Sequence, residues 1–411
     1  MRAKPKQLVY GCRRNWKCLP RASHKLTDVN TITRLLQNLV QRPSVNPMGR
    51  SDLPASITYE HRVTDFLESE LTAAQVPYER INVAPGRDNI VATFTPKNAT
   101  SHILFEAHQD TVPVDAMTID PFGGVIENGK LYGRGACDVK AGVATMLAAL
   151  LRLHAEKPAT AAKVTVAFTV DEEHTFLGVQ HLIASGVTAD FAIVAEPTNL
   201  DIVTSHKGVA RWTTTVYGLA CHSSKPHEGV NAIYKMGQIL GVIEGYSIHL
   251  NHHWRHPIFG DASISVGMIR GGTSANVVPD FCEIEIDRRM LPGTTAAWAM
   301  SDFDSHLRRH FEHRIGFQFK SKLTFACPAL MPVPESNEHL QRLRSTIEKT
   351  HRKPSLISVP FGTDASSLAE AGIPSVVFGP GDIAQAHTKD EWVNLAEVEA
   401  AAEILYRFAV S

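Results

Sequence analysis

The sequence predicts an α/β protein with a mainly parallel sheet that helices cover on both faces, and with a smaller α+β domain inserted into it. The first observation is that strand-like and helix-like runs alternate along the chain. The second is that the strand-like runs are continuously apolar, as in 164–170 (VTVAFTV), which is typical of parallel strands buried on both faces. The third is a change near Lys207, after which the strands alternate between apolar and polar residues, as half-exposed antiparallel strands do.

A chain of 411 residues is longer than one hydrophobic core usually organises, so two domains are expected. Its formal net charge of -1 argues against binding to nucleic acids or to membrane surfaces. No apolar run is long enough to span a bilayer. The six cysteines include no Cys-x-x-Cys pair, which indicates reduced thiols in a cytoplasmic protein rather than a disulfide framework.

The N-terminal segment, residues 1–27, is basic and contains no acidic residue. It lacks the apolar core of a secretory signal. An organelle transit peptide would also be rich in arginine and poor in acids, but this segment has few serines and no clear amphipathic pattern. We therefore expect a disordered extension, or a start codon assigned too far upstream.

The main domain begins at residue 28 with two amphipathic helices. Asp28 is expected to cap the first, in which Leu35, Leu36 and Leu39 have helical spacing, and residues 61–71 form the second. The helix after Asp138 is rich in Ala, Met and Leu, as a buried helix is. The predicted strands and helices that follow are strands at 89–94, 102–106, 164–170 and 191–194 and helices at 139–153 and 176–185.

Residues 207–325 are predicted to form the inserted domain, because the alternating strands lie there. The α/β pattern then returns, so residues 28–206 and 326–411 together make up the main domain. The elements predicted in the insertion are strands at 211–216, 262–269 and 282–287 and helices at 231–243 and 303–311. Those predicted after it are helices at 340–351, 366–371 and 396–408 and strands at 356–359 and 375–378.

Histidines and acids follow the predicted strands of the main domain. The run 104–115 (LFEAHQDTVPVD) ends a strand with His108 and Asp110, whose side chains point to the same side of an extended chain. Three acids at 171–173 follow VTVAFTV, and Glu196 follows the next strand. Because ligand sites in open α/β sheets lie at the carboxyl ends of strands, we expect these side chains to meet.

Asp138 and His387 extend this set. Asp138 opens the Ala-rich helix, and His387 follows the strand at 375–378. Each residue also has an ordinary interpretation. Asp138 could be a helix cap, the acids at 171–173 a solvated turn, Glu196 a turn residue before proline, and His387 a loop histidine with satisfied hydrogen bonds.

Together these residues offer two histidines, three carboxylates and a spare glutamate. That set suits two divalent ions that share one carboxylate and activate a water between them. Nitrogen and oxygen ligands without thiolate fit Zn²⁺ first, with Co²⁺ or Mn²⁺ as alternatives. Adjacent glutamates such as Glu172 and Glu173 can have different roles, one as a metal ligand and the other as a general acid/base.

From about residue 30 to its C-terminus, the chain resembles the dinuclear zinc amidohydrolases and peptidases, a family that includes acetylornithine deacetylases, succinyl-diaminopimelate desuccinylases, aminoacylases and carboxypeptidases. The motifs that carry the resemblance are His108-x-Asp110, Gly135-Ala-Cys-Asp138, Glu172-Glu173, Glu196-Pro-Thr, Gly218-Leu-Ala-Cys-His222-Ser-Ser and Ala386-His387. It implies a zinc exopeptidase-like fold and a metal-dependent hydrolase of linear amides.

The resemblance also implies a role for each site residue. The ligands of the two metals would be His108 and Glu196 for one ion, Glu173 and His387 for the other, and Asp138 as the bridge. Asp110 would orient His108, and Glu172 would be the general base. The peptide bond between Asp138 and Val139 is expected to be cis.

The inserted domain resembles the lid and dimerisation domain of this family, which implies a homodimer. His222 would reach into the partner subunit's site and stabilise the oxyanion. Asn276 and Arg289 match positions that bind the carboxylate of the substrate, a task that suits an arginine fork. Without the resemblance, a salt bridge at a strand edge is the alternative for Arg289.

Within the family, the resemblance is closest to the acetylornithine deacetylases of arginine biosynthesis, which implies an N-acyl amino acid as the substrate. Gly362-Thr-Asp-Ala, however, is more similar to other deacylases and carboxypeptidases. A desuccinylase, or a dipeptidase or carboxypeptidase with the same metals, is therefore an alternative. An inactive metal-binding scaffold is the alternative outside enzymes, and the intact Glu172 argues against it.

Overall fold

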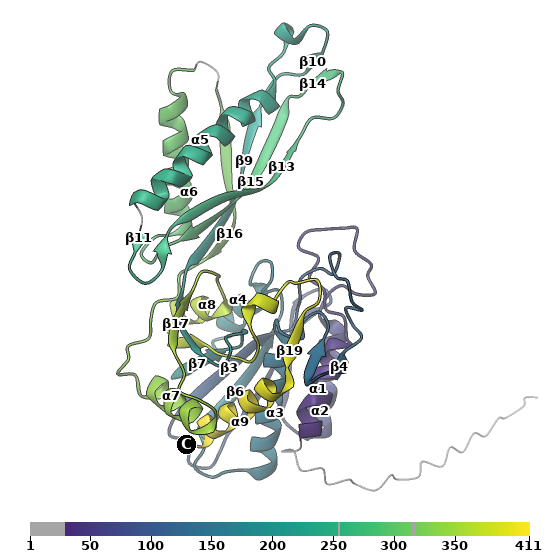
Figure 1. Cartoon of the computed structure of the whole chain (residues 1–411), viewed down its shortest axis with the longest axis vertical. Coiled ribbons are helices and arrows are strands. Elements are labelled where there is room, and N and C mark those ends of the chain that lie inside the picture. Colours follow the sequence, from purple (N-terminus) through teal and green to yellow (C-terminus); the bar gives the residue numbers. More distant parts are fainter. Residues whose placement is uncertain (1–28, 254, 315–316) are drawn as a thin grey trace, which may run out of the picture.

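The computed structural model describes residues 29–253, 255–314 and 317–411, so the predicted extension at 1–27 and its cap at Asp28 lie outside the described residues. Figure 1 shows two bodies. The larger contains the N-terminal and C-terminal parts of the described chain, and the smaller, elongated body is built from its middle. This arrangement confirms the predicted fold class.

The main domain is organised around an eight-stranded sheet with the order β1-β2-β6-β3-β7-β18-β8-β17. Its four central strands, β6, β3, β7 and β18, are parallel to one another, whereas β1 and β2 are antiparallel to their neighbours and β8 is antiparallel to β18. The bounds are β1 Tyr78–Ala84, β2 Arg87–Phe94, β3 His102–His108, β6 Lys163–Thr169, β7 Phe191–Val194, β8 Ile202–His206, β17 Leu356–Val359 and β18 Ser375–Val377.

Helices cover both faces of this sheet, as predicted. Helices α1, α2, α3, α7 and α9 share one hydrophobic core cluster, whereas α4 and α8 pack together in a second one. The bounds are α1 Val29–Val40, α2 His61–Ala73, α3 Lys140–Glu156, α4 Leu177–Ala184, α7 Glu338–Thr350, α8 Asp364–Glu370 and α9 Leu395–Val410. Among the described residues, no helix combines the length and the apolar character needed to cross a membrane.

Helix α3 approaches the end of β7 unusually closely because it carries Gly142 in its first turn. A Cβ atom at this position would lie 2.4 Å from the Cβ of Ala195, so only glycine fits without a shift. Ala195 directly precedes Glu196, and α3 begins two residues after Asp138. The small residues therefore bring the segments that carry Asp138 and Glu196 together.

The inserted domain is an antiparallel sheet with the order β13-β15-β9-β16, covered by α5 and α6 (Figure 1). Its core contains Trp212, Tyr246 and Phe303. The bounds are β9 Gly208–Tyr217, β13 Ser263–Gly271, β15 Phe281–Met290, β16 Phe319–Cys327, α5 Ala232–His253 and α6 Ala296–Phe311. The short elements at its ends are β10 Cys221–His222, β14 Val277–Val278, β11 Arg255–His256 and β12 Gly260–Asp261.

Several strands have no counterpart among the predicted elements. Besides the short elements of the inserted domain, these include β1, β8, β16, β4 (Val125–Glu127) and β19 (Trp392–Asn394). β5 (Lys130–Tyr132) is the middle strand of the three-stranded sheet β19-β5-β4. β1 is an edge strand in which Glu79 and Arg80 are exposed, so its sequence lacks an apolar run. β19 matters for the site, because its antiparallel pairing with β5 places the chain after His387 beside residues 130–132, which lead to Asp138.

Candidate metal centre and active site

The predicted site residues meet because four neighbouring parallel strands end at one edge of the main sheet. β3 ends at His108, β6 leads to Asp171 and the two glutamates after it, and β7 leads to Glu196. The loop after β18, the next strand in the sheet, carries His387. Neighbouring parallel strands present their carboxyl ends at the same edge, so residues far apart in the sequence become neighbours.

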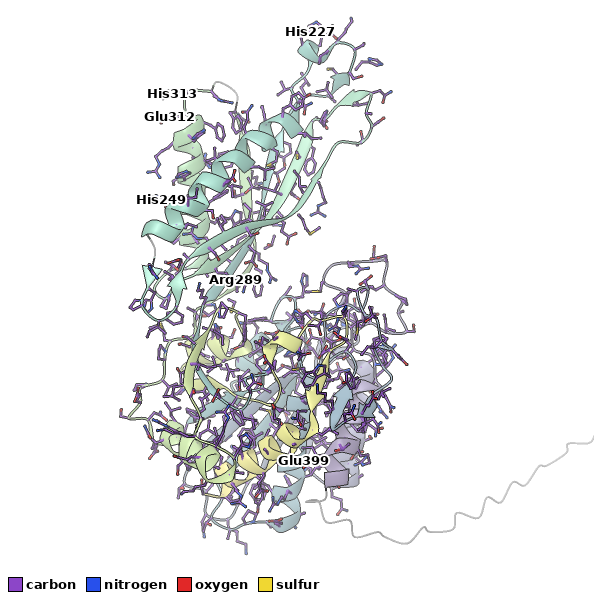
Figure 2. All side chains as sticks on the ribbon, in the orientation of Figure 1. His227, His249, Arg289, Glu312, His313 and Glu399 are labelled. Atoms are coloured by element: carbon purple, nitrogen blue, oxygen red, sulfur yellow. The ribbon has the colours of Figure 1, made fainter. Side chains whose placement is uncertain are left out.

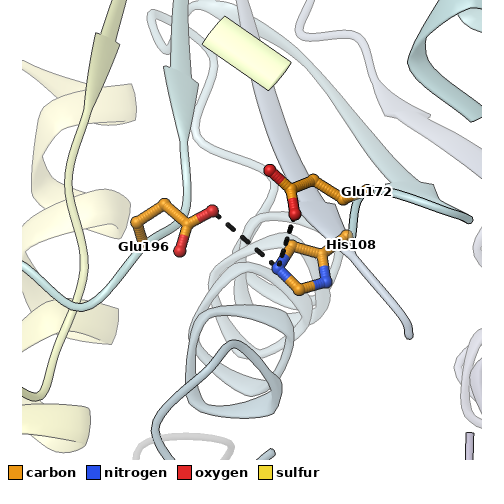
Figure 3. A group of neighbouring side chains, drawn as sticks. All are labelled: His108, Glu172 and Glu196. Atoms are coloured by element: carbon orange, nitrogen blue, oxygen red, sulfur yellow. Dashed lines mark ion pairs between the residues drawn. The ribbon is translucent and has the colours of Figure 1, made fainter. Parts of the chain in front are cut away.

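The first group of side chains surrounds the ring of His108, which is 2 % exposed. His108 Nε2 lies 3.8 Å from Glu196 Oε1 and 4.0 Å from Glu172 Oε2, as the dashed lines in Figure 3 mark. The same nitrogen is 3.3 Å from Asp138 Oδ1. One imidazole nitrogen thus faces three carboxylates at distances that leave room for an ion between them.

The second group consists of Asp138, Glu173 and His387. His387 Nε2 lies 3.2 Å from Asp138 Oδ2 and 3.3 Å from Glu173 Oε1. Asp138 therefore directs one oxygen to His387 and the other to His108, the placement that a bridging carboxylate needs. The peptide bond between Asp138 and Val139 is cis, as predicted.

The chemistry of these side chains fits two divalent cations. His108 Nε2 is buried and has no hydrogen-bond partner among the described residues, although carboxylates surround it. Burial raises the pKa values of Glu172 and Glu196 well above the ordinary value, and neighbouring carboxylates add to this effect. A cation among these oxygens would remove that penalty. The two groups contain no thiolate, which favours metals that accept nitrogen and oxygen ligands.

Asp110 supports the site in a different way from the one expected. His108 Nδ1 lies 3.0 Å from the main-chain oxygen of Asp110 but 3.6 Å from Oδ1 of its carboxylate. The carboxylate instead accepts hydrogen bonds from the main-chain N–H groups of Glu172 (3.2 Å) and Glu173 (3.1 Å) and from Asn46 Nδ2 (2.8 Å). Asp110 therefore orients His108 mainly through its carbonyl and holds the glutamate turn with its carboxylate.

Sequence reasoning missed the residues behind this turn. Asn46 Nδ2 also donates to Asp171 Oδ1 at 2.9 Å, and Arg87 Nη1 donates to the same oxygen at 2.6 Å. Arg87 Nε in turn lies 3.0 Å from a carboxylate oxygen of buried Glu60. An arginine that opens an apolar strand is the one signal in the sequence, because a buried arginine needs a buried acid as its partner.

A cavity of about 290 Å³ opens onto both groups. Its lining residues are Asp138, Glu172, Glu173, Glu196, Arg289, Phe361, Gly362, Ile383, Ala386 and His387. Arg289 comes from β15 of the inserted domain, and Figure 2 shows it at the junction of the two domains. Its Nε also donates to Asp287 Oδ1 at 2.8 Å, so the salt bridge named as the alternative exists beside the position in the cavity.

The structure does not bring His222 and Asn276 to the cavity of their own chain. Both are exposed: His222 ends β10 and Asn276 directly precedes β14, and Ser223 N donates to the main-chain oxygen of Asn276 at 3.0 Å. This pair lies at the end of the inserted domain that points away from the main domain (Figure 1). Within one chain, Asn276 and Arg289 are therefore separated.

Comparison with known proteins identifies relatives of the whole domain arrangement. The model of peptidase family M20/M25/M40 matches residues 104–411. An acetylornithine deacetylase of Photorhabdus laumondii is 30% identical over 380 residues, which cover 90% of this chain and 94% of that protein.

Solved structures with little sequence identity share the fold. The di-peptidase Dug1p from Saccharomyces cerevisiae has a TM-score of 0.74 at 16% identity, with 95% of this chain and all (100%) of that chain covered. A dinuclear metal-binding peptidase of the M20 family from Bacillus subtilis has a TM-score of 0.64 at 17% identity, with coverage of 93% of this chain and 97% of that one.

The raised pKa of His387 predicts that metal binding to the metal-free protein releases protons. Partial burial lowers the pKa of His387, but the carboxylates of Asp138 and Glu173 outweigh it and raise this pKa to about 11. The ring is then protonated at neutral pH, and an ion can bind only after the proton leaves. Zinc binding should therefore release protons, and the affinity should rise between about pH 6 and pH 8.

Calorimetric titration of the metal-free protein in buffers with different ionisation enthalpies measures the released protons. His387→Ala should bind one ion fewer and release fewer protons, whereas His181→Ala on helix α4 should behave as the wild type. Equal metal stoichiometry in His387→Ala and the wild type would contradict this assignment of His387.

Proposed function

The chain belongs to peptidase family M20/M25/M40, a family of hydrolases that act on amide bonds, and from this premise we propose that it hydrolyses the amide bond of an N-acyl amino acid. One cavity carries the proposal. Glu172 and Asp138 line it and face His108 and His387, and Arg289 of the inserted domain lines it as well. Acids, metal ligands and a carboxylate-binding group are what this reaction needs in one place.

Two divalent ions would be held by His108 and Glu196 on one side and by Glu173 and His387 on the other, with Asp138 between them. When bound, they supply Lewis acidity, which lowers the pKa of a water and polarises the amide carbonyl. Zn²⁺ is the first candidate and Co²⁺ the second, since the ligand set contains only nitrogen and oxygen. The Bacillus subtilis structure with this fold, which is described as dinuclear, supports a pair of ions.

Glu172 is the proposed general base. It lines the cavity, is 9 % exposed, and its neighbour Glu173 belongs to the second ligand group. Glu172 would take a proton from the attacking water and later return it to the departing amine. Burial, which raises its pKa, makes it a better proton acceptor than an exposed glutamate would be.

The groups that complete the site come from the inserted domain. Arg289 would bind the α-carboxylate of the substrate, because it lines the cavity and its Nε is fixed by Asp287. His222 of a partner subunit would stabilise the oxyanion that forms at the carbonyl, and Asn276 beside it would contact the carboxylate from the partner's side.

A homodimer through the inserted domain is supported by its surface. β13 is an edge strand of the domain, and Met268 and Ile269 on it are 51% and 55% exposed. Leu219 and Tyr234 nearby in the same domain are also exposed. An exposed apolar edge strand pairs readily with another chain.

N-acetyl-L-ornithine is the first candidate substrate, because relatives at about 30% identity are named acetylornithine deacetylases. With this substrate, the protein would be a cytoplasmic enzyme of arginine biosynthesis. One observation favours a second candidate, an N-acyl amino acid with a neutral side chain. Apart from the two ligand groups, the cavity lining in the described part of the chain is Arg289, Phe361, Gly362, Ile383 and Ala386, which offers no carboxylate for an ornithine ammonium.

The substitution Glu172→Ala tests the general base. It should leave two bound ions and lower kcat by about 10²–10⁴-fold, since a positioned base contributes that much. Glu173→Ala is the matched control, because it should lose one ion as well as activity. Metal analysis and steady-state kinetics measure both variants. A Glu172→Ala enzyme that retains metal and wild-type kcat would refute the assignment.

Mixed dimers test the contribution of His222 from the partner. Glu172→Ala and His222→Ala homodimers should both be inactive. A purified heterodimer of the two variants contains one intact site, so it should recover about half of the wild-type activity per dimer. Heterodimers that form correctly but stay inactive would place His222 outside the partner's active site.

A substrate panel tests the proposed function and separates its candidates. N-acetyl-L-ornithine and N-acetyl-L-norleucine have side chains of nearly equal length, and only the first carries an ammonium group. A higher kcat/KM for the ornithine compound supports the deacetylase of arginine biosynthesis, and a higher value for the norleucine compound supports the neutral class. N-succinyl-diaminopimelate and dipeptides report on the desuccinylase and peptidase alternatives. If the metal-loaded dimer hydrolyses none of these amides, the proposed function is wrong.

A further inference from the structure

The loop that carries Asp138 is fixed around a buried carboxylate from the far C-terminal part of the chain. Glu391 is 0 % exposed and directly precedes β19. Its Oε1 accepts hydrogen bonds from the main-chain N–H groups of Cys137 (2.8 Å) and Asp138 (3.0 Å). Its Oε2 accepts from Gly135 N (3.1 Å) and from Arg134 Nη1 (2.7 Å). Both oxygens are thus occupied by donors from residues 134–138.

Arg134 connects the same carboxylate to the loop of His387. Arg134 is 2 % exposed, and its Nη2 donates to the main-chain oxygens of Pro113 (3.2 Å) and Thr388 (3.4 Å). Thr388 directly follows His387, and Pro113 lies three residues after Asp110. A single buried ion pair therefore joins the Asp138 loop, the His387 loop and the segment after Asp110.

Glu391 repeats the arrangement of Asp110 on the other side of the cavity. Asp110 follows His108 by two residues, and its carboxylate accepts the main-chain N–H groups of Glu172 and Glu173. Glu391 follows His387 by four residues, and its carboxylate accepts the N–H group of Asp138. In both cases, the segment that supplies a histidine also holds the turn that supplies a carboxylate facing it.

We propose that Glu391, held by Arg134, is a positioning residue that fixes Asp138 and His387 at the spacing at which both bind the second metal ion. The inference rests on the two-metal site of the proposed function. Hydrogen bonds from main-chain N–H groups to a carboxylate are charge-assisted and strong, and this carboxylate makes three of them in addition to its ion pair. Without it, the N–H groups of Gly135, Cys137 and Asp138 lose their acceptor, and the contact of Cys137 Sγ with the main-chain oxygen of Asp382 (3.3 Å) is a weaker link between the two loops.

The substitution Glu391→Gln tests the proposal. Glutamine keeps the length of the side chain, but its NH₂ group cannot accept the hydrogen bonds that one oxygen receives now. One of the two ions should bind about 10–100-fold more weakly, the usual effect of losing a partner behind a metal ligand. Competition with a chromogenic chelator measures this affinity independently of catalysis, and kcat should recover at high metal concentration.

Glu403→Gln is the matched control. Glu403 on helix α9 also bonds an arginine, with its Oε2 2.7 Å from Arg152 Nη1, but it contacts no ligand loop. Its substitution should leave both metal affinities and kcat unchanged. If Glu391→Gln only destabilised the fold, the unfolding temperature of the metal-free variant would fall, but its affinity for one of the two ions would not fall selectively. Added metal would then not restore kcat.

The outcomes separate this inference from the proposed function. A wild-type chain that binds fewer than two ions overturns both. A wild-type chain that binds two ions, together with a folded Glu391→Gln variant that binds them equally tightly, overturns only the role of Glu391. Should that variant not fold, Arg134→Lys carries the test. It keeps the buried charge but loses the fork to Thr388, so unchanged metal affinity in it overturns the proposal.

Discussion

Negative charge buried around one imidazole ring is the constraint on which the rest of the structure depends. The carboxylates of Asp138, Glu172 and Glu196 all lie within 4.0 Å of His108 Nε2. Buried charges are costly unless they are paired or bind a metal. The structure balances the outer carboxylates with fixed groups, as main-chain N–H groups do for Asp110. The carboxylates that face the cavity are the ones left for cations to balance.

The sheet meets this constraint with segments that are far apart in the sequence. The parallel strands β6, β3 and β7 bring His108, Glu172 and Glu196 to one edge, and the carboxylate of Asp110 holds the turn that carries Glu172. Asp138 and His387 lie on loops instead, so they need further support. The buried pair Arg134–Glu391 gives that support, and it spans 257 residues of sequence. On both sides of the cavity, a buried carboxylate that accepts main-chain N–H groups therefore holds a turn that carries a site residue.

The sequence predicts the parts of this protein that depend on local pattern. The apolar runs of β3, β6 and β7 and the polar residues after them are visible because burial on both faces demands continuous apolar residues. β1 and β16 are not visible, since exposed strands of an edge carry polar residues such as Glu79 and Lys322. The roles of Asn46 and Arg87 cannot be predicted from the sequence for a different reason. They act through contacts with Asp110 and Asp171, and the only local sign of these contacts is the position of Arg87 at the start of an apolar strand.

Arg289 and His222 lie at opposite ends of the inserted domain. Arg289 lies where β15 meets the main domain and is fixed by Asp287, so it reaches the cavity of its own chain. His222 lies on the opposite end of the same domain, where its Nδ1 lies 2.7 Å from Ser224 Oγ. In the proposed homodimer, the partner chain would present this histidine to the cavity. A single chain therefore brings the carboxylates, the two histidines and Arg289 together at one cavity, and His222 lies outside it.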